Sequence, residues 1–114
     1  MKKKYRIKDS SRIQSVLNAR RKKADAFFSV YVSENTNGHF RYALSVGKKF
    51  GNAVKRNRIK RQIRMVLNDR VDHDASKDVF VIIRPAASKL TFADIDNKLM
   101  KLLKAHKLIR GEKK

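Results

Sequence analysis

Two short segments with alternating apolar and polar side chains constrain the fold most strongly. Residues 26–33 and 40–46 are rich in aromatic and β-branched side chains that recur at every second position, which is typical of half-buried β-strands. Between them lies Asn37-Gly38, the dipeptide that most favours a tight hairpin turn. The pattern therefore predicts two strands that pair antiparallel as a hairpin.

The rest of the chain alternates between helical and strand patterns. Helices are expected over about 10–20 and about 52–70, and the wholly apolar run 79–83 is typical of a central strand covered on both sides. Ser88 or Thr91 can cap a last helix. The apolar side of that helix is expected to comprise Phe92, Ile95, Leu99, Leu102 and Leu103. The order of elements predicts an α/β (α+β) two-layer sandwich with a small central sheet, as one domain over 1–114 with basic, flexible ends.

Charge narrows the choice of partner. The 114 residues include 30 Lys+Arg against 10 Asp+Glu, a formal net charge of +20, which favours a polyanionic partner, nucleic acid above all. The chain has no Cys, which excludes thiolate zinc fingers. Its apolar runs fall far short of the ~20 residues that span a bilayer. We expect a soluble cytoplasmic protein, with a DNA-binding architectural role ranking below RNA binding.

One helix concentrates this charge. No acid occurs between Glu34 and Asp69, and on the helix expected over 52–70 the cations Arg56, Lys60 and Arg64 form an i, i+4, i+8 row beside Asn57 and Arg61. Such a row weakens a helix by like-charge repulsion, so it is not explained by the fold. Arginine holds a phosphate with two hydrogen bonds, and an asparagine amide can reach a 2′-OH or a base edge. The row predicts an RNA-binding face.

The sequence shows no active site of its own. Asp72-His73-Asp74 is the only candidate for metal binding or acid–base chemistry, and it is expected to be a surface turn. Gly47–Gly51 lacks the spacing of a nucleotide-binding loop. Of the aromatic side chains in the first strand, Phe28 is expected in the core, whereas Tyr31 is the better candidate for a surface that stacks on RNA bases.

The segment from Phe40 to Arg64, with Arg-Asn-Arg at 56–58, resembles the signature of the bacterial ribonuclease P protein subunit. The resemblance continues over nearly the whole chain, through Arg6-Ile7-Lys8, Phe28 to Tyr31 and Val81 to Ala86. It implies a left-handed crossover between parallel strands, against the usual right-handed rule. The charge and fold class alone would equally fit a structural RNA-binding protein of ribosomal type.

The resemblance also implies a function and a set of site residues. It implies a subunit that binds a catalytic RNA and the 5′ leader of precursor tRNA, while that RNA removes the leader with Mg²⁺. No catalytic residue, bound metal or cofactor, membrane or protein partner is expected for the chain itself. The implied RNA-binding residues are Lys48, Lys49, Asn52, Lys55, Arg56, Asn57, Arg58, Lys60, Arg61 and Arg64. The implied leader-binding cleft comprises Ile13, Leu17, Tyr31, Lys60 and Arg64.

This chain departs from the family in the cleft. Ile13 and Leu17 stand where the family commonly has aromatic residues. Stacking of a base on an aromatic ring contributes about 1–3 kcal/mol, which an aliphatic side chain does not reproduce. We therefore expect leader contact through Tyr31 and the cations, with stacking at 13 and 17 weakened or replaced by packing.

Overall fold

The computed structural model describes residues 3–111, and the expected flexibility of the extreme ends concerns residues 1–2 and 112–114, which lie outside them. Three helices and four strands make up the regular structure. In chain order they are α1 (Ser10–Asn18), β1 (Lys22–Ala24), β2 (Phe28–Glu34), β3 (Arg41–Val46), α2 (Ala53–Arg70), β4 (Lys77–Ile83) and α3 (Phe92–Ala105). Three short 3-10 helices are η1 (Lys3–Tyr5), η2 (Lys48–Phe50) and η3 (Pro85–Lys89).

The sheet has the strand order β1-β2-β4-β3, so the predicted hairpin between β2 and β3 is wrong. β4 lies between them, antiparallel to β2 with Val30 opposite Val81, and parallel to β3 with Leu44 opposite the same residue. The reason is that a strand as apolar as β4 is buried best with a partner on each side. The Asn37-Gly38 turn reverses the chain, but it does not decide which strands become neighbours.

β1 was not expected. It consists of Lys22, Lys23 and Ala24, all exposed, and pairs antiparallel with β2 at the edge of the sheet. Its sequence has no alternation of apolar and polar residues, because an exposed edge strand needs only backbone hydrogen bonds to its neighbour. Two lysines on such an edge also discourage pairing with other chains.

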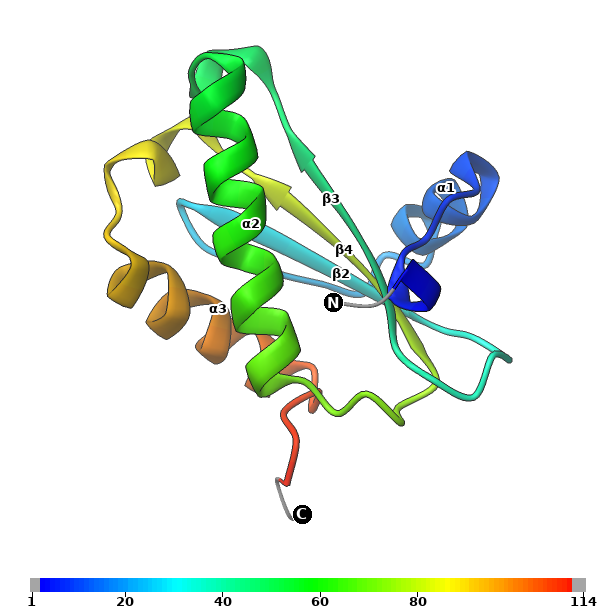
Figure 1. The fold of residues 1–114 in the computed structure, drawn as a ribbon. Coiled ribbons are helices and arrows are strands. Elements are labelled where there is room, and N and C mark those ends of the chain that lie inside the picture. Colours follow the sequence, from blue (N-terminus) through cyan, green and yellow to red (C-terminus); the bar gives the residue numbers. More distant parts are fainter. Residues whose placement is uncertain (1–2, 112–114) are drawn as a thin grey trace.

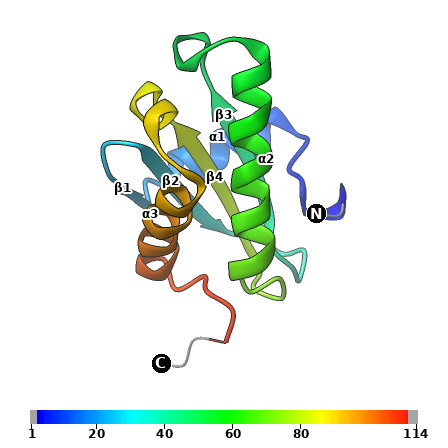
Figure 2. The same ribbon diagram turned by 60° about the vertical axis from the view of Figure 1, so that its left-hand side comes forward.

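Helices cover both faces of the sheet. α2 and α3 pack on one face, where Phe28, Val30 and Val32 of β2 meet Leu99 and Leu103 of α3 in the core, and α1 lies against the other face (Figures 1 and 2). With α2 in front of the sheet and the parallel strands rising, β4 lies to the left of β3 in Figure 1. The crossover from β3 through α2 to β4 is therefore left-handed.

A buried carboxylate fixes α1 to the sheet. Asp78 of β4 has a fully buried side chain that accepts hydrogen bonds from Arg12 of α1, from Arg41 of β3 at 2.9 and 3.0 Å, and from Asn35 at 2.7 Å. Burial alone would raise the pKa of Asp78, but the hydrogen bonds from Arg41, Arg12 and Asn35 outweigh it and hold the pKa below its ordinary value of 3.8. Arg12 thereby sets the position of α1 over the sheet.

The helix boundaries follow from local capping. α1 ends at Asn18, two residues earlier than expected, and Arg20 takes the left-handed conformation with φ 59°. The Asn52 side chain caps α2 by accepting from the Lys55 amide at 3.0 Å. Thr91 caps α3 in a reciprocal capping box with Asp94, as one of the two expected caps.

The expected apolar side of α3 is confirmed for four of its five residues. Ile95, Leu99, Leu102 and Leu103 are buried, but Phe92 is 40% exposed. Phe92 is the first residue of α3, and this N-terminal end of the helix lies beyond the edge of the core. Helical periodicity gives the direction of a side chain and not the extent of the surface that it meets.

Candidate nucleic-acid interface

The loop before α2 and the first turns of α2 present cations to solvent. Lys48 and Lys49 are exposed on η2, and Lys55, Arg58 and Arg61 are exposed on α2. In residues 3–111 none of the five forms a salt bridge. Asn52 is exposed as well, but its side-chain oxygen Oδ1 caps α2. Of the side-chain amide, only the NH₂ group therefore remains open to a ligand.

The row Arg56, Lys60 and Arg64 lies on a different flank of α2, and all three side chains are half-buried. The Nε atoms of Arg56 and Arg64 are shielded from solvent and have no hydrogen-bond partner among the described residues. None of the three forms a salt bridge within this part of the chain. No carboxylate among the described residues therefore neutralises their charges.

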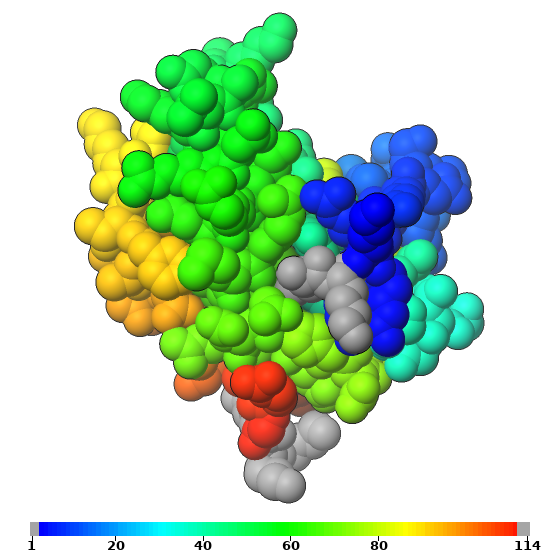
Figure 3. All heavy atoms as spheres, in the orientation of Figure 1, coloured from blue at the N-terminus to red at the C-terminus, as the bar shows by residue number. Residues whose placement is uncertain are grey.

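Lys60 and Arg64 form one wall of a groove of about 290 Å³, here called the first groove. Its other walls are the segment Arg6–Lys8, Ile13 of α1 and the part of β3 from Tyr42 to Leu44. The Ile7 amide donates to the Tyr42 carbonyl at 2.8 Å, which holds the N-terminal segment along the edge of β3. Figure 3 views this side of the molecule, with α2 in green and the N-terminal segment and α1 in blue. Among residues 3–111, four cations and no acid line the first groove.

The structure brings together part of the expected leader-binding cleft. Ile13, Lys60 and Arg64 share the first groove, whereas Leu17 and Tyr31 are absent from its lining. Tyr31 is half-buried on β2, with Lys22 Nζ 5.8 Å from its ring centroid, and Leu17 is half-buried on α1. Tyr31 alternates with the buried Val30 and Val32, so it lies on the face of the sheet that α1 covers.

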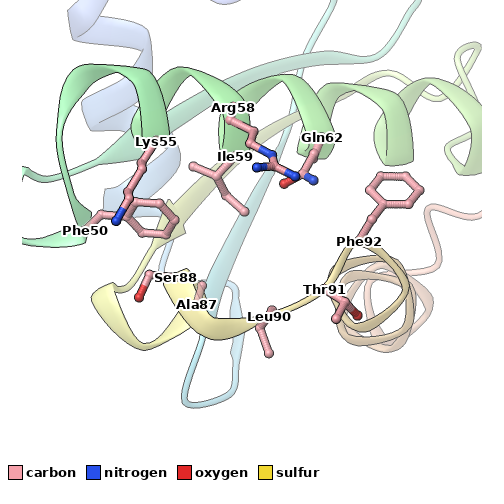
Figure 4. Close-up of a pocket in the computed structure, with 10 residues that line it drawn as sticks. All are labelled: Phe50, Lys55, Arg58, Ile59, Gln62, Ala87, Ser88, Leu90, Thr91 and Phe92. Atoms are coloured by element: carbon pink, nitrogen blue, oxygen red, sulfur yellow. The ribbon is translucent and has the colours of Figure 1, made fainter.

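A second groove, of about 310 Å³, lies on the opposite flank of α2, between this helix, η3 and the start of α3 (Figure 4). Lys55 and Arg58 line it together with Gln62, Phe50, Ser88 and Phe92. The sequence pattern did not assign Gln62 or Phe92 to a binding surface. A signal was present for Gln62, because it follows Arg58 by four residues and so shares its flank of the helix.

A third cationic surface lies at the β1 edge. Arg20, Arg21, Lys22 and Lys23 gather there with Lys107 around His106, whose Nε2 is 2.8 Å from the Val30 carbonyl oxygen. Burial lowers the pKa of His106, and the nearby Arg21 and Lys23 lower it further. The four cations at 20–23 thus lie apart from the two grooves.

The Asp72-His73-Asp74 segment forms a turn. The Asp72 carboxylate accepts from the Asp74 amide at 3.0 Å, and the His73 ring packs 5.0 Å from the ring of Tyr5. Burial lowers the pKa of His73. Within residues 3–111 no group of three or more His, Cys, Asp and Glu side chains is placed to hold a metal ion. No helix in this part of the chain is long and apolar enough to cross a membrane.

The fold and these surfaces are those of a small, basic α+β protein of the nucleic-acid-binding class. The sequence model of the family Ribonuclease P matches residues 1–107. The chain belongs to the ribonuclease P protein family.

Relatives support this assignment over most of the chain. The ribonuclease P protein component of Mycoplasma mycoides subsp. mycoides is 39% identical over 106 residues, which are 91% of this chain and 97% of the relative. That of Streptococcus equi subsp. equi is 40% identical over 109 residues, which are 96% of this chain and 92% of the relative.

Solved structures share the fold. The RNase P protein of Staphylococcus aureus has a TM-score of 0.83 at 37% identity and covers 93% of this chain and 98% of its own. The RNase P protein from Thermotoga maritima has a TM-score of 0.78 over 88% of this chain and 96% of its own. At 24% identity, the latter supports the fold alone.

Proposed function

We propose that this chain is the protein subunit of a ribonuclease P, an endoribonuclease, and binds its catalytic RNA along α2. We further propose that it contacts the 5′ leader of precursor tRNA in the first groove. Family membership supports the assignment to this enzyme, and relatives of the chain carry the name ribonuclease P protein component. The catalytic RNA performs the hydrolysis with Mg²⁺ in the cytoplasm, and the protein contributes binding.

The row of Arg56, Lys60 and Arg64 carries this proposal. Successive members of an i, i+4 row rise by about 6 Å along the helix, a spacing that suits contacts to successive phosphates of one strand. All three side chains are half-buried, Lys60 and Arg64 line the first groove, and the described residues provide the row with no acid partner. A bound polyanion would supply the missing counter-charges.

The first groove suits the leader because it combines cations with apolar surface. Arg6, Lys8, Lys60 and Arg64 can contact phosphates, and Ile13 provides an aliphatic surface against which a base can pack. Tyr31 remains a proposed leader contact on the face of the sheet that α1 covers. To reach Tyr31, a single RNA strand would have to leave the first groove, pass α1 and continue along that face of the sheet.

The test is cleavage of a precursor tRNA by a bacterial ribonuclease P RNA at low Mg²⁺, with and without this protein. We expect the wild-type protein to restore cleavage and the double variant Arg56→Ala/Lys60→Ala to lose most of this effect. The matched control is Lys101→Ala/Lys104→Ala, which removes the same charge from exposed positions on α3. If the protein binds the RNA without promoting cleavage, a structural RNA-binding role of ribosomal type replaces the proposal.

A further inference from the structure

The second groove combines exposed cations with an exposed aromatic ring, whereas the aromatic residue that lines the first groove, Tyr42, is buried. It has an exposed aromatic ring, two exposed cations and uncharged polar side chains, all within about 310 Å³. None of the described residues that line it is an Asp or Glu. Cations beside an exposed aromatic ring are the recurring arrangement in surfaces that bind single-stranded nucleic acid.

Phe92 contributes a partly exposed aromatic ring to the second groove. The other members of its helical stripe are buried in the core, whereas the Phe92 ring is 40% exposed. Figure 4 shows this ring rising from the first turn of α3 toward α2, while Arg58 and Gln62 extend from α2 toward the same opening. One isolated exposed apolar side chain is ordinary on a protein surface. Its position opposite a guanidinium and an amide is what suits it to a ligand.

Lys55 is held beside the same opening by local packing. An added Cβ at Gly51 would lie only 2.9 Å from Lys55 Cδ, so the glycine allows the lysine stem to lie close against the turn before α2. In Figure 4 the Lys55 side chain descends beside the Phe50 ring, at the end of the groove away from Phe92. Lys55 and Arg58 form no salt bridge within residues 3–111, so their charges are available to a ligand.

We propose that the second groove holds one unpaired nucleotide of the RNA partner, with its base against Phe92 and its phosphate at Lys55 and Arg58. Gln62 and Ser88 supply an amide and a hydroxyl that can meet the base edge or the ribose. This proposal rests on the proposed function, since it assumes that the chain binds RNA.

An unpaired nucleotide fits better than a duplex. The groove has the volume of a small-ligand site, and a base can stack on Phe92 only when its own face is free. The carboxylates of an acidic peptide would satisfy Lys55 and Arg58 but do not stack on the Phe92 ring, whereas every nucleotide carries an aromatic base together with its phosphate. The ring therefore decides between the two occupants.

The experiment measures the affinity of the full chain for a bacterial ribonuclease P RNA transcript at raised salt, where phosphate contacts weaken and stacking persists. The variants are Phe92→Ala, Phe92→Tyr and, as control, Met65→Ala. Met65 is an apolar residue of α2 that is 50% exposed and lines neither groove. We expect Phe92→Ala to weaken binding roughly 5- to 100-fold and Phe92→Tyr to remain close to wild type, since tyrosine keeps the ring.

The outcomes separate this proposal from the proposed function. If Phe92→Ala binds like Met65→Ala, or if Phe92→Tyr is as weak as Phe92→Ala, no base stacks on the ring and the proposal is overturned. If the groove bound a peptide instead of RNA, Phe92→Ala would likewise bind the RNA transcript as tightly as Met65→Ala does. Failure of the wild-type protein to restore cleavage at low Mg²⁺ would instead overturn the proposed function. Thermal unfolding of each variant shows whether a weaker affinity reflects a less stable fold.

Discussion

Arg58 and Lys60 lie two positions apart on α2, yet they line grooves on opposite flanks of the helix. At about 100° per residue, two positions correspond to about 200° around the helix axis. The Arg-Asn-Arg motif at 56–58 therefore does not form a single patch, because Arg56 belongs to the row with Lys60 and Arg64. An RNA that engages the whole motif has to cross α2 or present two separate segments to it.

This division predicts that the two grooves contribute independently to RNA affinity. Arg58→Ala and Lys60→Ala should each weaken binding and lower the slope of log K against log salt by about 0.7–0.9 for each phosphate that the variant no longer neutralises. In the double variant the two free-energy changes should add to within about 0.5 kcal/mol. Filter binding of the catalytic RNA over a salt series measures both quantities.

The matched pair for this comparison is Lys60 and Arg64, which share the first groove. Their double variant is expected to deviate from additivity, because neighbouring cations contact the same RNA segment. A coupling between Arg58 and Lys60 as large as that between Lys60 and Arg64 would show that one RNA segment reaches both grooves.

Local signals in the sequence were sufficient for the helices and for the identity of the central strand. The N-cap residues Asn52 and Thr91 set the starts of α2 and α3, because capping depends on residues only three positions apart. Strand pairing could not be obtained in this way. In the sequence, α2 separates β4 from its partner β3, and both β3 and α2 separate β4 from its partner β2. The turn residues Asn37-Gly38 therefore carried no information about these pairings.

The candidate site shows the same contrast. The angular position of Lys60 and Arg64 on one flank of α2 follows from helical geometry, and the structure places both in one groove. The opposite wall of the first groove comes from Arg6–Lys8 and Ile13, and that of the second groove from Phe92. Their positions depend on how the N-terminal segment, α1 and α3 pack against the sheet, which no local pattern in the sequence determines.

Asp78 should be the most sensitive polar position in the fold. Asp78→Asn keeps the volume of the side chain but leaves Arg12 and Arg41 without their counter-charge beneath α1. Because both arginines remain partly exposed, we expect a decrease of about 2–3 kcal/mol in the free energy of unfolding, below the range for a fully buried pair. Denaturant unfolding followed by circular dichroism measures it.

Glu34→Gln is the control for charge removal. Glu34 pairs with Lys77 and Arg21, but its side chain is 64% exposed. An exposed pair contributes little, so this substitution should cost less than about 1 kcal/mol. Equal decreases for the two variants would mean that the buried network does not hold α1 in place.

The same carboxylate predicts a stability that falls in acid. The pKa of Asp78 is lower in the folded protein than its ordinary value of 3.8, so the folded state favours the ionised form. Its contribution is fully present well above pH 3.8 and is lost as the pH falls through this value toward the lower folded pKa. Unfolding free energies measured from neutral pH into acid should decline less steeply for Asp78→Asn than for wild type. Parallel curves would contradict the assignment.

Asn52 allows a capping role to be separated from RNA contact. Asn52→Ala should reduce the stability of the protein by about 1 kcal/mol, because the Lys55 amide loses its acceptor. Asn52→Asp retains a favourable cap and should preserve stability, while its negative charge opposes a bound phosphate. We therefore expect Asn52→Asp to weaken RNA binding without destabilising the fold. Unchanged RNA affinity in this variant would leave Asn52 with a capping role alone.

The last prediction concerns the aliphatic residues at the expected leader-binding cleft. Ile13 lines the first groove and Leu17 does not, so a ring introduced at 13 is better placed to stack on a leader base. We expect Ile13→Phe to increase holoenzyme affinity for a precursor tRNA with a leader, relative to the same tRNA without one. The gain has an upper bound of about 1–3 kcal/mol from a single stacked base. Leu17→Phe is the matched comparison and should give a smaller gain. No change at 17 would remove Leu17 from the leader-binding surface, and no change at 13 would show that the leader bypasses the first groove.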